Sequence, residues 1–239
     1  MIDKIPEKKW VNYFSNLRNK YNTRVSKNKV LIIFLDAKDS SKNKINLLRG
    51  SNDDFFMSVQ KTTKVFTQKY NCLAICGTDE ISFIFENSDE LINTINNEKK
   101  YRTHDIVSIF SQYFFEYFKN SYNKSTIYWH CNCFNIPSDK VSSYLKYKSR
   151  RILKGTTAFF LKQKGIKNAN GIKLDEKLKL FYSYEDYILI DDYKEGLVYL
   201  NGDEIVLNEY LNGKIVKANL EINFNDADIF DLQEFDEEF

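Results

Sequence analysis

The stretch CGTDEISFIF, Cys76–Phe85, places two adjacent carboxylates, Asp79 and Glu80, directly before a run of β-branched and aromatic residues. Such a run is typical of a buried strand, and the Gly-Thr-Asp-Glu sequence before it indicates a turn. Because the preceding NCLAIC is equally apolar, the segment predicts a hairpin with both acids at its tip. Crowded carboxylates are costly unless a cation compensates them, so these two acids are candidates for a functional site.

The elements on either side of this hairpin predict the fold class. The apolar run VLIIFL (30–35) ends at Asp36 and predicts a central strand, and TIYWHCNCFNI (126–136) predicts a last strand. Apolar residues three and four apart predict helices over about 52–70 and 103–120. The order β-α-β-β-α-β is that of the ferredoxin-like α+β arrangement.

This topology predicts where the acids meet. Right-handed crossovers place the third strand between the first and the second, with all neighbours antiparallel. The end of the first strand then lies beside the hairpin tip, which brings Asp36 to Asp79 and Glu80. Converging carboxylates are suited to Mg²⁺, which takes one or two protein carboxylates and completes its shell with water and phosphates. We therefore expect a Mg²⁺ site at this end of the sheet.

The rest of the chain predicts an extension packed on this core. A helix is expected after Pro137, with Ser138 as its cap; from Lys140 to Lys154 it carries six basic residues and no acid. Apolar segments at 187–192, 196–207 and 213–224 predict a β-rich C-terminal elaboration. We expect residues 1–136 to form the catalytic core and residues 137–239 to pack on it, in a single structural unit.

Composition restricts the class of protein and its partners. The chain has 239 residues, 43% of them hydrophobic, and a net charge of +2. Residues 226–239 hold seven acids and no base. Residues 1–225 therefore carry an excess of positive charge, which favours binding to RNA. Four cysteines do not form a secreted-type disulfide framework, and no apolar run is long enough to span a bilayer. We expect an intracellular protein, cytoplasmic or organellar, with no membrane partner.

The motifs resemble those of the tRNA-histidine guanylyltransferases and their like proteins, which are 3′-to-5′ nucleotide polymerases with a polymerase-type palm. The hairpin TDEISFIF is very similar to that family's S-D-E-Y-S-F-V-F, and IIFLDAK stands where the family has an apolar strand followed by D-G-R. CFNIPSD and YLKYKS match its Y-P-S-[ND] turn and Y-L-S-W-R-Q helix. The resemblance extends over nearly the whole chain.

The resemblance implies an activity and assigns roles to residues. Two Mg²⁺ ions would be held by Asp36, Asp79 and the Ala37 carbonyl, with Glu80 assisting. The implied reaction is attack by the 3′-hydroxyl of an incoming nucleotide, GTP by preference, on a tRNA 5′ end activated with ATP. The family also suggests a homotetramer. The residues expected to hold the nucleoside triphosphate are Asp36, Ala37, Lys38, Asp39, Ser40, Ser41, Thr78 and Asp79. Apart from the resemblance, positive charge beside the two predicted helix starts and along the basic helix makes five residues candidates to contact RNA or triphosphate: Arg49, Arg102, Lys148, Arg150 and Arg151.

Departures from the family pattern bear on the substrate. The family's F-D-[GA]-R segment is Trp129–Asn132 here, and its H-I-N-N motif has no counterpart in SRRILKGTT. A like protein that repairs or extends other RNA 5′ ends therefore fits better than a strict histidine-tRNA enzyme. Two alternatives stay open. One is a nucleotide cyclase or signalling synthase, because GTDE also resembles the G-G-D-E-F hairpin, and the other is an inactive RNA-binding relative.

Overall fold

A single antiparallel sheet forms the centre of the molecule, with strand order β4-β1-β3-β2-β5-β6. The computed structural model describes residues 7–20, 29–38, 54–88, 91, 103–122 and 127–215. In this part of the chain the strand β3 lies between β1 and β2, as the sequence predicts. The strands are β1 (Val30–Ala37), β2 (Leu73–Cys76), β3 (Glu80–Phe85), β4 (Trp129–Ile136), β5 (Leu197–Leu200) and β6 (Asp203–Ile205).

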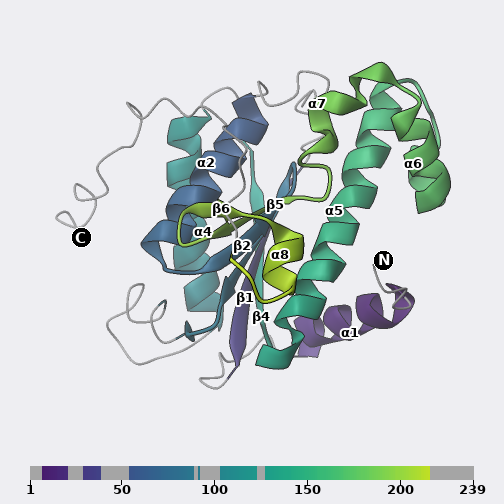
Figure 1. Cartoon of the computed structure of the whole chain (residues 1–239). Coiled ribbons are helices and arrows are strands. Elements are labelled where there is room, and N and C mark those ends of the chain that lie inside the picture. Colours follow the sequence, from purple (N-terminus) through teal and green to yellow (C-terminus); the bar gives the residue numbers. More distant parts are fainter. Residues whose placement is uncertain are drawn as a thin grey trace.

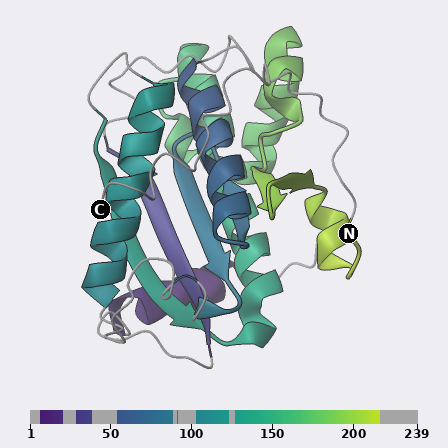
Figure 2. The ribbon, with the colours of Figure 1, turned by 90° about the vertical axis from the view of Figure 1, so that its left-hand side faces the viewer.

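The helices α2 (Asp54–Lys69) and α4 (Thr103–Ser121) cover one face of the sheet (Figures 1 and 2). Because alternate residues of a strand point to opposite faces, Leu31, Ile33 and Leu35 of β1 all pack into this layer. Its centre is aromatic: the ring of Phe66 lies 5.4 Å from that of Phe110, centroid to centroid. Both helices begin close to the predicted positions, and residue 52, where the first was predicted to begin, lies outside the described residues.

The helices α1 (Glu7–Lys20) and α5 (Val141–Gln163) cover the other face (Figure 1). Tyr144 of α5 is buried here with Phe14 of α1, and their rings are 5.2 Å apart. α5 follows a short 3-10 turn at Ser138–Lys140 and continues to Gln163, beyond the basic segment that the sequence indicates. Ser138 makes no capping hydrogen bond, so the prediction of a Ser138 cap is wrong.

From residue 137 to residue 215 the chain is largely helical, which corrects the prediction of a β-rich elaboration for this part. Residues 196–207 do form the predicted hairpin, and β5 extends the sheet by pairing with β2. Residues 187–192, however, belong to a 3-10 turn and α7, because Ile190 and Tyr193, three residues apart, are buried while Ile188 and Leu189 are exposed. Residues beyond 215 lie outside the described part. The other helices here are α6 (Leu174–Tyr182), α7 (Ile188–Asp191) and α8 (Leu207–Leu211).

None of the helices in the described residues is long and apolar enough to cross a membrane. All four cysteines are free, and Cys72, Cys76 and Cys133 are buried. Burial raises the pKa of the Cys76 thiol to about 12, so this side chain behaves as an apolar core residue.

Candidate active site

The tip of the β2–β3 hairpin is a tight turn over which α5 passes closely. The Gly77 N–H donates to the Glu80 carbonyl at 2.7 Å, which leaves Thr78 and Asp79 as the two loop residues. A Cβ at Gly77 would lie 3.0 Å from two side-chain carbons of Ile152 on α5. The absence of a side chain at Gly77 thus lets the helix approach the tip, and the two elements enclose a site.

Asp36 meets the hairpin at this tip, as the topology predicts. Asp36 pairs in register with Glu80, and the Ala37 N–H donates to the Asp79 carbonyl at 2.8 Å. Burial raises the pKa of the Asp36 carboxyl, and the charges of Asp79 and Glu80 raise it further. Lys148 and His130 oppose this effect. The geometry therefore concentrates negative charge, which is the condition for binding a cation.

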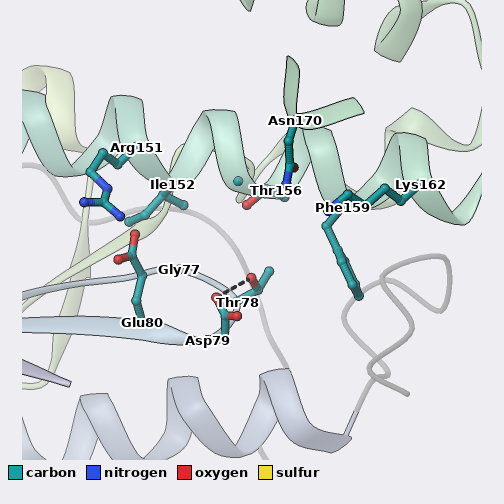
Figure 3. A pocket seen from close by; sticks show the side chains of 11 residues that line it. Gly77, Thr78, Asp79, Glu80, Arg151, Ile152, Thr156, Phe159, Lys162 and Asn170 are labelled. Atoms are coloured by element: carbon teal, nitrogen blue, oxygen red, sulfur yellow. Dashed lines mark hydrogen bonds between the residues drawn. The ribbon is translucent and has the colours of Figure 1, made fainter. Parts of the chain in front are cut away.

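The acids of the hairpin differ in direction. The Thr78 hydroxyl donates to Asp79 Oδ1 at 3.3 Å, so Asp79 lies at the tip beside Thr78 (Figure 3). Glu80 instead points toward α5 and Arg151. Although adjacent in sequence, the two carboxylates therefore occupy different surroundings, and the difference separates their roles.

Glu80 forms a buried ion pair with Lys148 of α5. Lys148 Nζ lies 2.7 Å from Glu80 Oε2, and the side chains are 4% and 13% exposed, respectively. The same ammonium group lies 4.2 Å from the centroid of the Phe34 ring. Burial lowers the pKa of Lys148, whereas the Glu80 carboxylate favours its charged form. Lys148 is thus withdrawn from the surface where the sequence places it as an RNA contact, and it neutralises Glu80.

A pocket of about 170 Å³ opens between the hairpin tip and α5 (Figure 3). The acids Asp79 and Glu80 lie on one wall, together with Thr78. The opposite wall comes from α5 and the turn that follows it, and its polar members are Arg151, Thr156, Lys162 and Asn170. An occupant would thus contact carboxylates on one side and cationic and amide groups on the other.

The residues at this tip fit a Mg²⁺ site that is completed by its substrate. Among the residues that the structure describes, no three His, Cys, Asp or Glu side chains are arranged to hold a metal ion. Mg²⁺ needs fewer protein ligands, because it keeps several waters and uses substrate phosphates. Glu80 is already paired with Lys148, so Asp36 and Asp79 are the carboxylates suited to this ion. Burial and, to a lesser extent, the charges of Asp79 and Glu80 raise the pKa of Asp36, and a bound cation would oppose both effects.

Two of the backbone groups that the sequence assigns to triphosphate binding are already used. The Ala37 N–H donates to Asp79, and the Lys38 N–H donates to the Tyr128 carbonyl at 2.7 Å. These two N–H groups join the end of β1 to the segments on either side of it, the hairpin and the segment leading into β4. Five further residues predicted to contact triphosphate or RNA lie outside the described residues: Asp39, Ser40, Ser41, Arg49 and Arg102.

The two predicted arginines on α5 have different surroundings. Arg151 is exposed and lines the pocket, and its guanidinium donates to the Tyr147 hydroxyl at 3.2 Å. Arg150 is half-buried and is not among the pocket-lining residues. Sequence reasoning missed the pairing of Lys148 with Glu80. The four-residue spacing of Tyr144, Lys148 and Ile152 was the available signal, since it places Lys148 on the buried face of the helix.

Solved structures share this fold. A bacterial tRNA(His) guanylyltransferase-like protein in complex with GTP is 14% identical, with a TM-score of 0.58 over 83% of this chain and 86% of the other. Its complex with ATP is 13% identical, with a TM-score of 0.52 over 80% and 88%. The tRNA(His) guanylyltransferase of Saccharomyces cerevisiae is 19% identical, with a TM-score of 0.52 over 81% and 95%. No family model and no curated protein sequence matches the chain. At these identities the likeness establishes the fold.

Proposed function

We propose that this protein is a nucleotidyltransferase that adds nucleotides in the 3′-to-5′ direction to the 5′ end of tRNA or tRNA-like RNA. GTP is the proposed incoming nucleotide, and ATP is proposed to activate the 5′ end. One observation carries the proposal: Asp36 and the Asp79 hairpin converge at one end of the sheet, within a fold shared with tRNA(His) guanylyltransferases. We assign the core to the polymerase-type palm on the same basis.

The chain would contribute binding and electrostatics to this reaction. The 3′-hydroxyl oxygen of the incoming nucleotide bonds to the phosphorus of the activated 5′ end. The bond to AMP breaks, or the bond to pyrophosphate where the RNA end is a triphosphate, and the hydroxyl proton is released. Asp36 and Asp79, with the Ala37 carbonyl, would hold two Mg²⁺ ions, which when bound polarise the phosphoryl oxygens and neutralise their charge.

Glu80 and the pocket have separate proposed roles. Because Lys148 neutralises Glu80, this carboxylate would support the site through its position rather than as a metal ligand. Arg151 and Lys162 on the opposite wall would meet phosphate oxygens of a bound substrate, since guanidinium and ammonium groups make charge-assisted hydrogen bonds to phosphate. Thr78 would hold Asp79 in its orientation.

Incubation with 5′-monophosphorylated tRNA, ATP, Mg²⁺ and labelled GTP tests the proposal. Label should enter the RNA with the unchanged protein and with Asp139→Asn, a control at an exposed acid. Asp36→Asn and Asp79→Asn should each abolish incorporation. Asp36→Asn should also raise the Tm of the metal-free protein, because it removes a carboxylate that its neighbours repel. Failure to label any of several tRNAs, or full activity in Asp36→Asn, would contradict the proposal.

The same reaction mixtures separate the two alternatives. A cyclic or condensed nucleotide formed from GTP or ATP without RNA would identify a cyclase or signalling synthase. Tight RNA binding with no nucleotide product of either kind would identify an inactive relative.

A further inference from the structure

Lys177 of α6 is a buried lysine that has no carboxylate partner among the residues that the structure describes. Its side chain is 3% exposed. Within the described part of the chain its ammonium group makes one hydrogen bond, a long one of 3.5 Å from Nζ to the Lys154 carbonyl. Burying an ammonium group in this way is costly, because water is removed and no opposite charge replaces it. The ammonium group of Lys177 therefore needs an opposite charge from another source.

Other lysines near α6 and α7 do have acidic partners. Lys164 Nζ lies 2.5 Å from Asp186, and Lys194 Nζ lies 2.9 Å from Asp191. The surroundings of Lys177 are therefore distinct from those of its neighbours. Among the described residues, this region therefore pairs Lys164 and Lys194 with carboxylates and leaves Lys177 without one.

The charges nearest Lys177 are positive. Burial lowers the pKa of Lys177, and the ammonium groups of Lys154 and Lys162 lower it further. Lys154 and Lys162 are eight residues apart on α5, so they share a face of that helix. α6 packs against α5 there, with the rings of Phe160 and Phe181 4.9 Å apart. The fold thus gathers three lysines from two helices into one cluster, Lys154, Lys162 and Lys177, called here the lysine cluster.

The lysine cluster is continuous with the active-site pocket. Lys162 belongs to both, because it lines the pocket wall opposite Asp79 and Glu80. Lys154 and Lys177 are not among the pocket-lining residues, so they extend the positive charge beyond it. A polyanion whose reactive end lies at the carboxylates would place its following phosphates along this cluster.

We propose that Lys154 and Lys162 bind the phosphate backbone of the RNA whose 5′ end enters the pocket, with the charge of the buried Lys177 behind them. The identity of the RNA rests on the proposed function, whereas the site rests on Lys154 and Lys162 beside the pocket and on the buried Lys177, to which the described residues supply no carboxylate. Phosphate contacts by lysine supply affinity without reading sequence. The cluster is therefore suited to hold many RNA ends, and it replaces Lys148 as the cationic group that meets RNA.

A fluorescently labelled tRNA transcript tests the site by equilibrium binding at several salt concentrations. Lys154→Gln/Lys162→Gln should weaken binding about tenfold at 0.15 M salt. It should also lower the slope of log K against log salt by roughly 1.5 to 2, because two phosphate contacts are lost. Lys64→Gln/Lys119→Gln is the matched control, since these exposed lysines lie on α2 and α4 across the sheet and should leave both quantities unchanged.

The variant Lys177→Met supplies a second test, because a lysine with only a structural role would give a different change in Tm and in tRNA binding. It should raise the Tm of the free protein, because it removes an uncompensated buried charge, and it should weaken tRNA binding. The control Lys164→Met breaks the ion pair with Asp186, so it should lower Tm. A lower Tm with unchanged tRNA binding in Lys177→Met would show that the residue is structural and would overturn the proposal. If Lys177→Met does not fold, tRNA binding by the double variant Lys154→Gln/Lys162→Gln decides whether the proposal stands.

These measurements do not depend on nucleotide transfer. If the unchanged protein binds tRNA through the cluster but transfers no label, the site stands and the proposed reaction falls. If transfer occurs but Lys154→Gln/Lys162→Gln keeps its affinity and salt slope, the site falls and the reaction stands. Loss of ATP or GTP binding in the double variant with unchanged tRNA binding would also overturn the proposal, in favour of a nucleotide site.

Discussion

The buried ion pair between Lys148 and Glu80 yields a quantitative prediction about stability. Lys148→Met keeps most of the side-chain volume but leaves Glu80 charged, 13% exposed and close to Asp36. Removing one partner of a buried pair costs about 3–5 kcal/mol. Because Glu80 retains some contact with water, we expect the lower end, about 3 kcal/mol. For a chain of this size that is a fall in Tm of roughly 6–12 °C.

Urea unfolding followed by circular dichroism, in a double-mutant cycle with Glu80→Gln, measures this coupling. Each single variant leaves one unpaired charge, whereas Lys148→Met/Glu80→Gln leaves none. The double variant should therefore be more stable than Lys148→Met alone. Lys148→Arg keeps both the charge and the contact with the Phe34 ring, so it should lose less than Lys148→Met.

A control on the same side of the sheet sets the scale for an exposed pair. Lys140 Nζ lies 2.8 Å from Asp139, with side chains 34% and 68% exposed. Lys140→Met should lower the urea midpoint far less than Lys148→Met does, because exposed pairs are screened by water. The reasoning is refuted if Lys148→Met costs no more than Lys140→Met, or if the double variant is as unstable as the sum of its two single variants.

Two further predictions concern Glu204 and Gly196. Burial raises the pKa of Glu204 to about 7, so the folded state binds this proton more tightly than the unfolded state, whose pKa is near 4.5. The stability that this proton contributes is fully present below pH 4.5 and is lost as pH rises through 7. The urea midpoint should fall over this range, and less so in Glu204→Gln; equal falls would contradict the assignment. Gly196 has φ +91°, and an added Cβ would lie 2.8 Å from Ile152 Cδ1 and 3.0 Å from the Cys76 carbonyl oxygen. Gly196→Ala should cost about 1–3 kcal/mol in the same assay, whereas the control Gly155→Ala, with open space around its Cβ, should be neutral or stabilising; equal effects would refute the reasoning.

The arrangement of the acids was predictable because it depends on local pattern and chain topology. Apolar runs identify β1 and the hairpin, and the handedness of the crossovers decides which strand lies in the middle. Asp36 comes at the end of one run and Asp79 at the turn between two others. Their convergence follows without any knowledge of side-chain packing.

The sequence by itself therefore determined the central strands and the carboxylates at their end. Packing decided the rest. Whether Lys148 faces RNA or Glu80 depends on how α5 lies across the sheet, and whether Lys177 has a partner depends on how α6 lies against α5. Residues 188–191 form the helix α7, and Ile190 packs with Tyr193 in the apolar core. Such contacts join residues far apart in the chain, and short-range periodicity does not encode them.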